Sequence, residues 1–315
     1  MRAGRAGRFN GVMDTRTELT ERPLIPGDAR AVYEVMAAQE LDDLGMIEIE
    51  EADIVGDWAR PSFDVSAQTI GVFDGARLVG YAEIAGADRG DAAVHPAYRG
   101  RGIGTRLARW MQDTARGRGS TVVGMPVPEG SPSDRLLSEL GYRVRWTSWV
   151  LKLPAGATIV RRDLPEGYAL REAAPSEHAE VHAVVEDAFL EWSVREREPF
   201  EDFAASVMGR PGFEPWNLRV VVDGAGAVVG VAHVVIAETE DDRDSEAFIS
   251  RLAVRHDLRR RGLAQALMVD AFAVAREHGA VVSGLSTDSR TGALGLYERV
   301  GMNVTSVWVN RAIDL

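Results

Sequence analysis

Two arginine- and glycine-rich segments have the residue types and spacing that suit anion binding. Residues 94–104 read VHPAYRGRGIG and residues 254–264 read VRHDLRRRGLA, so an Arg-x-x-Gly-x-Gly/Ala pattern occurs twice, 160 residues apart. In each copy a strand-like apolar run precedes the segment and a long amphipathic helix pattern follows it. A glycine turn at a helix N-terminus exposes unpaired backbone N–H groups, and arginines add positive charge. Both segments are therefore predicted to bind a pyrophosphate or another phosphate group.

The residues expected to contact this ligand follow the motif in each copy. They are Val94, Arg99, Gly100, Arg101, Gly102, Ile103 and Gly104 in the first copy, and Arg259, Arg260, Arg261, Gly262, Leu263 and Ala264 in the second. A Walker loop is a poor alternative because no Gly-Lys-Ser/Thr follows, and a dinucleotide-binding fingerprint would need three glycines after an early strand.

Other landmarks repeat in the same order and divide the chain into two halves. Gly141 follows Gly102 by 39 residues, and Gly301 follows Gly262 by the same 39 residues. An Asp-Gly pair, typical of a hairpin turn, precedes each segment at residues 74–75 and 223–224. The predicted organisation is a basic, disordered tail (1–12), an N-terminal domain (13–155) and a C-terminal domain (156–315), with a linker near residues 154–156.

The elements that must position the second segment follow from hydrophobic periodicity. A strand over residues 248–254 precedes it, and a helix from residue 262 to about 278 follows it. The remaining expected elements of this half are strands over 168–171, 218–222, 228–235, 281–285 and 304–310, with helices over 176–189 and 291–300. The first half matches, and its last predicted strand covers residues 148–153.

Composition excludes several classes of protein. The formal net charge is −12 and the sequence pI about 5.1, which argues against a nucleic-acid-binding role despite Arg2, Arg5 and Arg8 at the N-terminus. The chain has no cysteine, no membrane-spanning apolar run and no secretory signal pattern, so a cytoplasmic protein is expected. His178 and His182 share a predicted helix face, but two histidines without a third ligand do not predict a metal site.

The repeated segment resembles the signature of the GNAT superfamily of N-acetyltransferases, and the resemblance covers the chain from about residue 17 to 315 as two consecutive copies. It implies an α/β (mixed α+β) fold of two GNAT-type domains, each with a splayed central sheet flanked by helices. The implied cofactor is acetyl-CoA, whose pyrophosphate binds the loop. The tandem arrangement is similar to that of mycothiol synthases, which acetylate a cysteinyl amino-sugar.

The two copies differ at the position that the resemblance assigns to a catalytic acid. Residues 296–301 resemble the family's Leu-Tyr-x-x-x-Gly segment, whose tyrosine protonates the departing thiolate, and this makes Tyr297 the predicted acid. Leu137 occupies the same position in the first half, and a leucine cannot donate a proton. Catalysis is therefore expected in the C-terminal half. Arg290 stands where many relatives carry a cofactor-binding asparagine, so it is expected at the cofactor.

The implied mechanism is attack of a neutral amine on the thioester. Backbone of Leu252, Ala253 and Val254 is expected to hold the thioester oxygen and to pair with the pantetheine amides. Glu246, at the start of this strand, is the predicted general base, although a solvated glutamate is an equally open interpretation. The hairpin before it carries an acidic insertion, Glu238, Glu240, Asp241, Asp242 and Asp244, which could attract a cationic amine or simply be solvated.

These observations predict an N-acetyltransferase for a small-molecule amine, without nucleic-acid or membrane partners, acting as a monomer or homodimer. Two alternatives stay open. A non-catalytic acyl-CoA sensor would bind the cofactor without turnover, and a protein Nα- or Lys-acetyltransferase would need an open acceptor groove.

Overall fold

The computed structural model of the 315-residue chain describes residues 18–154, 156–161, 163–237 and 245–315. The predicted basic tail (1–12) and the acidic insertion (238–244) lie outside these residues. Across the described ranges, no helix is both long and apolar enough to cross a membrane. The same ranges hold no cluster of His, Asp or Glu side chains placed to bind a metal ion.

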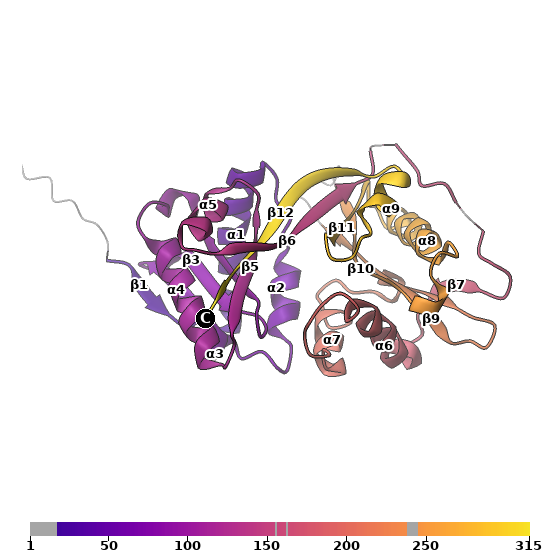
Figure 1. Ribbon diagram of the computed structural model, residues 1–315, viewed down its shortest axis with the longest axis horizontal. Helices are drawn as coiled ribbons and strands as arrows, with labels where there is room; N and C mark the ends of the chain where they lie inside the picture. The colour runs from indigo at the N-terminus through magenta and orange to yellow at the C-terminus, as the bar shows by residue number, and fades with distance from the viewer. Residues whose placement is uncertain (1–17, 155, 162, 238–244) are drawn as a thin grey trace, which may run out of the picture.

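The two halves repeat one order of helices and strands (Figure 1). The first half comprises β1 (Thr20–Arg22), α1 (Ala29–Leu44), α2 (Glu51–Trp58), α3 (Val65–Gln68), β2 (Thr69–Asp74), β3 (Arg77–Ile84), β4 (Gly90–Val94), α4 (Ile103–Gly117), β5 (Val122–Pro128), α5 (Pro132–Glu139) and β6 (Arg143–Lys152). The second comprises β7 (Ala169–Glu172), α6 (His178–Phe189), α7 (Phe200–Ser206), β8 (Leu218–Val222), β9 (Val228–Ala237), β10 (Glu246–Val254), α8 (Leu263–Glu277), β11 (Val282–Asp288), α9 (Leu294–Arg299) and β12 (Asn303–Asp314).

Three predicted element boundaries differ from the structure. β6 begins at Arg143, five residues before the predicted start, and β12 continues to Asp314 because each has a neighbour along its full length. α9 begins at Leu294 and not at Thr291, because the Thr291 hydroxyl accepts a hydrogen bond from the Ala293 amide and forms a turn before the helix.

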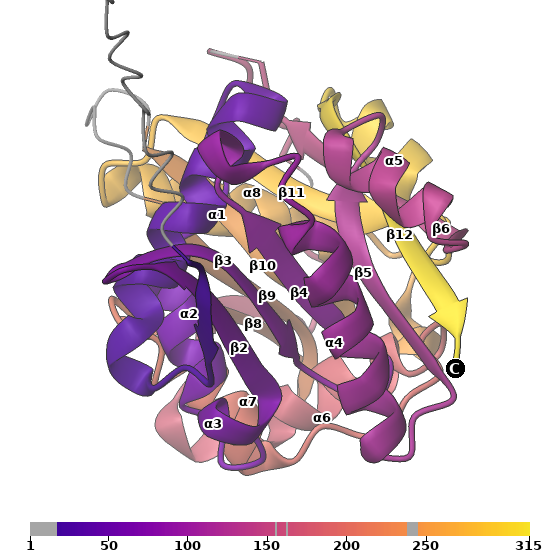
Figure 2. The same ribbon diagram turned by 90° about the vertical axis from the view of Figure 1, so that its left-hand side faces the viewer.

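The strands form two sheets that are both splayed at the repeated loop. A four-stranded sheet has the order β1-β2-β3-β4, and an eight-stranded sheet has the order β5-β12-β6-β11-β10-β9-β8-β7. In the second half, β10 and β11 pair in parallel only as far as Ile249 and Leu285 and then separate. In the first half, a single isolated bridge between Arg89 and Gly124 joins the strand layer of β4 to β5. Figure 2 shows α4 on one face of the first sheet and α1 and α2 on the other. This confirms the predicted mixed, splayed architecture.

The last strand of each half crosses into the other half. β12 lies between β5 and β6, and β6 lies between β12 and β11, so each half receives one strand from its neighbour (Figure 1). The exchange is symmetric: Trp308 pairs with Pro128 and Asp288 pairs with Ser148, positions related by the same 160-residue offset as the loops. Hydrophobic packing follows the exchange, because Leu151 belongs to the core of the second half and Val309 to the core of the first.

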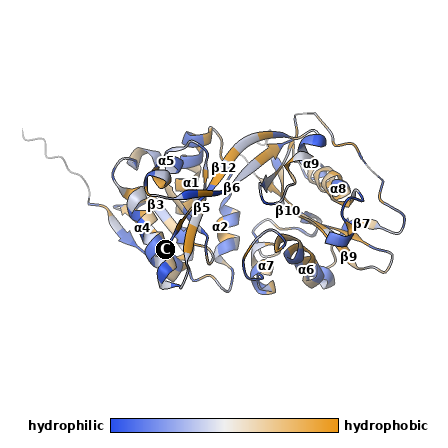
Figure 3. Ribbon diagram, viewed as in Figure 1, coloured by the Kyte–Doolittle hydropathy of each residue, from blue (hydrophilic) through white to orange (hydrophobic). Residues whose placement is uncertain are grey.

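The two loop helices, α4 and α8, differ in how much of their surface is covered. α8 buries residues around most of its circumference, and it is hydrophobic over much of its length (Figure 3). Part of its cover comes from the segment after β6, where Gln265 donates a hydrogen bond to the Val160 carbonyl. α4 buries one stripe, residues 103, 107, 108, 111 and 115, and leaves the rest to solvent, as expected of an amphipathic surface helix.

A buried carboxyl group in the first half makes stability depend on pH. Glu83 on β3 accepts a hydrogen bond from the Trp58 indole at 2.9 Å, and burial raises its pKa from 4.5 to about 7. The folded chain therefore binds this proton more tightly than the unfolded chain, and stability from this group falls as the pH rises from about 4.5 through 7. Glu83→Gln removes the ionisation and should stabilise the chain above pH 7 by about 1–3 kcal/mol.

Urea unfolding of wild type and Glu83→Gln at pH 4 and pH 8 measures this difference. The two proteins should have similar stability at pH 4 and separate at pH 8. Glu139→Gln, at an exposed position, serves as the control and should show no such pH-dependent gain. Equal stabilities of wild type and Glu83→Gln at both pH values would contradict the assignment.

Candidate active site

The second arginine–glycine segment lines a cavity of about 790 Å³ in the C-terminal half. The cavity lies where β10 and β11 separate, and its walls come from β10, the start of α8, β11 and α9. Of the residues predicted to bind the cofactor, the structure places Leu252, Ala253, Val254, Arg259, Arg260, Gly262, Leu263 and Ala264 in this wall. The predicted acid Tyr297 lines the same cavity, although it lies 45 residues after Leu252 in the sequence.

The loop exposes a curved row of backbone N–H groups. Arg260 (φ 64°) and Gly262 (φ 86°) adopt the left-handed conformation, as Gly100 (φ 74°) and Gly102 (φ 78°) do in the first half. Among the described residues, the amides of residues 260–265 and 100–105 have no hydrogen-bond partner. A Cβ atom added at Gly262 would meet nothing within 4 Å. Such a nest at a helix N-terminus fits the pyrophosphate of an acyl-CoA.

The arginines of the second loop do not share one role. Arg259 forms a bidentate ion pair with Glu191 (2.7 and 2.8 Å) and donates to the Val254 carbonyl, so it fastens the loop to the segment after α6. Arg260 lines the cavity with its side chain. Arg261 points away from it and lies 3.4 Å from the Tyr168 hydroxyl. Arg260 is therefore the loop arginine best placed to meet a phosphate.

Arg290, the fourth arginine predicted at the cofactor, does not line the cavity. Its guanidinium lies 3.6 Å from the centre of the Trp146 ring and 4.7 Å from that of Trp192, and it pairs with Asp288 at 2.5 Å. Trp146 comes from β6, the strand that the first half contributes, so the arrangement joins the two halves. The described contacts assign Arg290 a structural role beside the cavity.

The edge of β10 offers a free hydrogen-bond donor to a ligand in the cavity. The Arg255 amide donates to Val229 in β9 at 3.0 Å. Because consecutive amides of a strand point to opposite edges, the Val254 amide points away from β9, toward the gap left by β11. It has no partner among the described residues. This amide is placed to bind a thioester carbonyl or a pantetheine amide.

Tyr297 carries an available phenol. The side chain is 8% exposed, and burial raises the pKa of its hydroxyl from 10.0 to about 12. The hydroxyl makes no hydrogen bond to any described residue, so its proton is free for a ligand in the cavity. At neutral pH the phenol is fully protonated, which is the state that a proton donor requires.

Glu246, the predicted base, lies in a neighbouring cavity and not in the one that holds Tyr297. This second cavity, of about 350 Å³, lies between the two halves and shares Ser148 and Ser286 with the first. One carboxylate oxygen of Glu246 accepts a hydrogen bond from Lys152 at 2.6 Å, and the other is buried without a described partner. An unpaired buried oxygen is costly, so it marks a point where a donor from a ligand is favoured.

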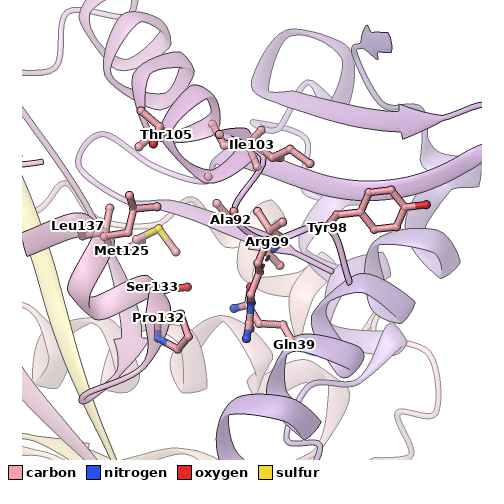
Figure 4. A pocket seen from close by; sticks show the side chains of 18 of the residues that line it. Gln39, Ala92, Tyr98, Arg99, Ile103, Thr105, Met125, Pro132, Ser133 and Leu137 are labelled. Atoms are coloured by element: carbon pink, nitrogen blue, oxygen red, sulfur yellow. Dashed lines mark hydrogen bonds between the residues drawn. The ribbon is translucent and has the colours of Figure 1, made fainter. Parts of the chain in front are cut away.

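The first half has a smaller cavity at the corresponding place. It measures about 300 Å³ and is lined by Val94, Arg99, Gly100 and residues 102–104 of the predicted set, while Arg101 stacks on Tyr98 outside it (Figure 4). Leu137 takes the place of Tyr297. Arg99 pairs with Asp42 (2.6 Å) and Asp43 (2.9 Å), which repeats the fastening role of Arg259.

The sequence reasoning missed several residues of these cavities. Lys152 and Glu48 reach the inter-half cavity from parts of the first half, and Glu191 and Asp42 hold the loop arginines. The acids had a detectable signal: aligning Pro26 with Pro175 places Asp42 and Glu191 at the same helix-end position. The position of Lys152 depends on the strand exchange, for which the sequence carries no local signal.

The sequence matches the model of the acetyltransferase (GNAT) family over residues 32–142 and again over residues 179–302. Similar curated proteins are named mycothiol acetyltransferase. That of Salinispora arenicola is 28% identical over 313 residues, covering 94% of this chain and 95% of the relative. That of Thermobispora bispora is 28% identical over 311 residues, covering 92% and 96%.

Solved structures agree with the tandem architecture. A GCN5-related N-acetyltransferase from Sphaerobacter thermophilus has a TM-score of 0.69 and 25% identity, covering 94% of this chain and 95% of that one. A tandem GNAT protein from the clavulanic acid biosynthesis pathway has the same TM-score at 19% identity, covering 94% and 98%, and so shows the fold. These findings confirm the predicted tandem fold and acyltransferase class. Because the family match covers more than half of the chain and recurs in each half, this chain belongs to the acetyltransferase (GNAT) family, whose members use acyl-CoA.

Proposed function

We propose that the chain is an acetyl-CoA-dependent N-acetyltransferase that acts on a small-molecule amine, with its catalytic site in the C-terminal half. One observation carries this proposal. The free Val254 amide, the unpaired loop amides and the free phenol of Tyr297 all face one cavity, so a carbonyl, a pyrophosphate and a leaving sulfur each have a matching group. In the first half, Leu137 removes the acid.

The proposed reaction needs no proton from outside. The amine nitrogen forms a bond to the acetyl carbon, the carbon–sulfur bond breaks, and the amine loses the proton that the sulfur gains. The Val254 amide stabilises the negative charge that develops on the carbonyl oxygen. Tyr297 donates a hydrogen bond to the departing sulfur, and its high pKa keeps it protonated throughout.

The acceptor is proposed to enter through the cavity between the halves. Seven carboxylate side chains of the described residues line it, against two cationic ones, Arg89 and Lys152. Its potential therefore favours a cationic amine, as does the unpaired oxygen of Glu246. Burial also raises the pKa of Glu48, while the neighbouring Lys152 opposes this shift. An enclosure of about 350 Å³ suits a small molecule better than a polypeptide.

Acetyl-CoA with a panel of amines tests the function directly. The panel should contain amino sugars, aminoacyl amino sugars and polyamines, and release of the CoA thiol is measured together with the mass of the acetylated product. Turnover with at least one small amine is expected. Tight acetyl-CoA binding with no turnover across the panel would favour the sensor alternative, and turnover with peptides alone would favour a protein acetyltransferase.

Glu246 is the proposed general base, and its replacement tests the mechanism. Glu246→Gln keeps the shape of the side chain but cannot accept a proton, so kcat should fall about 10–100-fold, at the low end of such contributions, because Lys152 already weakens the carboxylate as a base. Acetyl-CoA affinity should stay unchanged, since Glu246 does not line that cavity.

Steady-state kinetics and calorimetry separate these effects. Glu48→Gln is the matched control, because it removes another carboxylate of the same cavity. It should raise the KM of the amine with little change in kcat. Unchanged kcat in Glu246→Gln would exclude this residue as the base.

A further inference from the structure

The edge of β4 in the first half is closed by one side chain. The His95 amide donates to Val79 in β3 at 2.9 Å, so the Val94 amide points away from β3, as Val254 points away from β9. The Val94 amide is not free: it donates to the side-chain oxygen of Gln39 at 2.9 Å. Gln39 lines the first-half cavity from α1, beside Arg99 (Figure 4).

The second half has no polar atom at the corresponding place. The ion pairs of the loop arginines align the two helices, since Asp42 binds Arg99 and Glu191 binds Arg259. Gln39 lies three residues before Asp42, and Ala188 lies three residues before Glu191. Ala188 lines the second-half cavity, and its methyl group leaves the Val254 amide uncovered.

We propose that Gln39 closes the first half to acyl thioesters, so that the chain binds one acyl-CoA, in the C-terminal half. This inference rests on the proposed function, because it assumes acyl-CoA binding there. Both loops have the same left-handed positions and unpaired amides, so the phosphate nest does not distinguish the halves. The strand edge does, because a thioester carbonyl or pantetheine amide must displace the Gln39 oxygen to reach Val94.

The cavity volumes point the same way. The closed cavity measures about 300 Å³ and the open one about 790 Å³. Gln39 is half-buried at the wall of the smaller cavity, so shortening it to alanine both frees the Val94 amide and widens the space beside it. The residue at this helix position thus decides whether a half accepts the acyl arm.

Reciprocal substitutions in the full chain test the inference. Calorimetric titration with acetyl-CoA, without an amine, should give one site per chain for wild type and two for Gln39→Ala. Ala188→Gln should weaken binding at the C-terminal site at least tenfold. Gln39→Glu, which also accepts the Val94 amide, should retain one site. Ala188→Met is the matched bulk control and should weaken binding less than Ala188→Gln.

The outcomes separate this inference from the proposed function. Two sites in wild type, or one site in a folded Gln39→Ala variant, would overturn the role of Gln39 and leave the C-terminal site intact. No binding to wild type would instead overturn the proposed function. Thermal unfolding of each variant confirms that the stoichiometry is read on folded protein.

Discussion

Tyr297→Phe should lower kcat by about 10²–10⁴-fold, the range typical of a lost general acid, while the affinity for acetyl-CoA changes little. The phenol is the one group of the cavity with a free proton at the position assigned to the leaving sulfur, and phenylalanine retains its ring in the packed core of the second half. The expected loss is confined to the chemical step, so a non-catalytic acyl-CoA sensor would show no comparable effect.

The pH dependence of turnover sharpens this test. Because the pKa of Tyr297 is about 12, its proton is present throughout the range from pH 6 to pH 10, and no loss of activity from this group is expected there. The rate should instead rise toward the pKa of the amine, about 10.4 for an alkyl ammonium, as the neutral nucleophile accumulates.

Tyr142→Phe is the matched control for Tyr297→Phe. Tyr142 is also a buried tyrosine with a raised pKa, but it lies in the first half, where its hydroxyl contacts Gln112 and the Ala108 carbonyl. Its replacement should leave kcat unchanged. A Tyr297→Phe enzyme that retains wild-type kcat would remove the proposed acid from the mechanism.

Neither half should fold as an independent unit when it is produced alone. A fragment of residues 13–155 lacks β12, so β5 and β6 lose the strand that lies between them. β6 also loses β11, and Leu151 loses the hydrophobic core in which it is fully buried. Unpaired strand edges and exposed apolar surface favour aggregation. The intact chain should therefore unfold in one cooperative transition.

Leu151→Ala tests this coupling within the full chain. The substitution should cost about 2–5 kcal/mol, as for other buried leucines, and hydrogen exchange should show lost protection in β10 and β11 of the second half. Val309→Ala is the mirror experiment and should reduce protection in α4 and β5 of the first half. Two separate unfolding transitions, each confined to one half of the sequence, would contradict the proposed coupling.

Local patterns were sufficient to predict the fold class, the tandem repeat and the loop. The glycine positions, the amphipathic helices and the Asp-Gly turns are short-range signals, because backbone conformation and side-chain periodicity are set by neighbouring residues. The same signals placed Tyr297 and the residues of β10 near the loop, and the structure brings them into one cavity. They could not separate Arg260 from Arg261 and Arg290, since three arginines in a row give no indication of which one turns inward.

The sequence by itself thus determined the architecture, the anion-binding loops and the inequality of Tyr297 and Leu137. Tertiary structure alone decided which half each terminal strand completes, and with it the place of Lys152 beside Glu246. It also decided that Gln39 covers the Val94 amide, 55 residues away. The physical reason is that strand partners and cross-chain hydrogen bonds depend on which edges meet in space, and an alternating apolar strand is compatible with several partners.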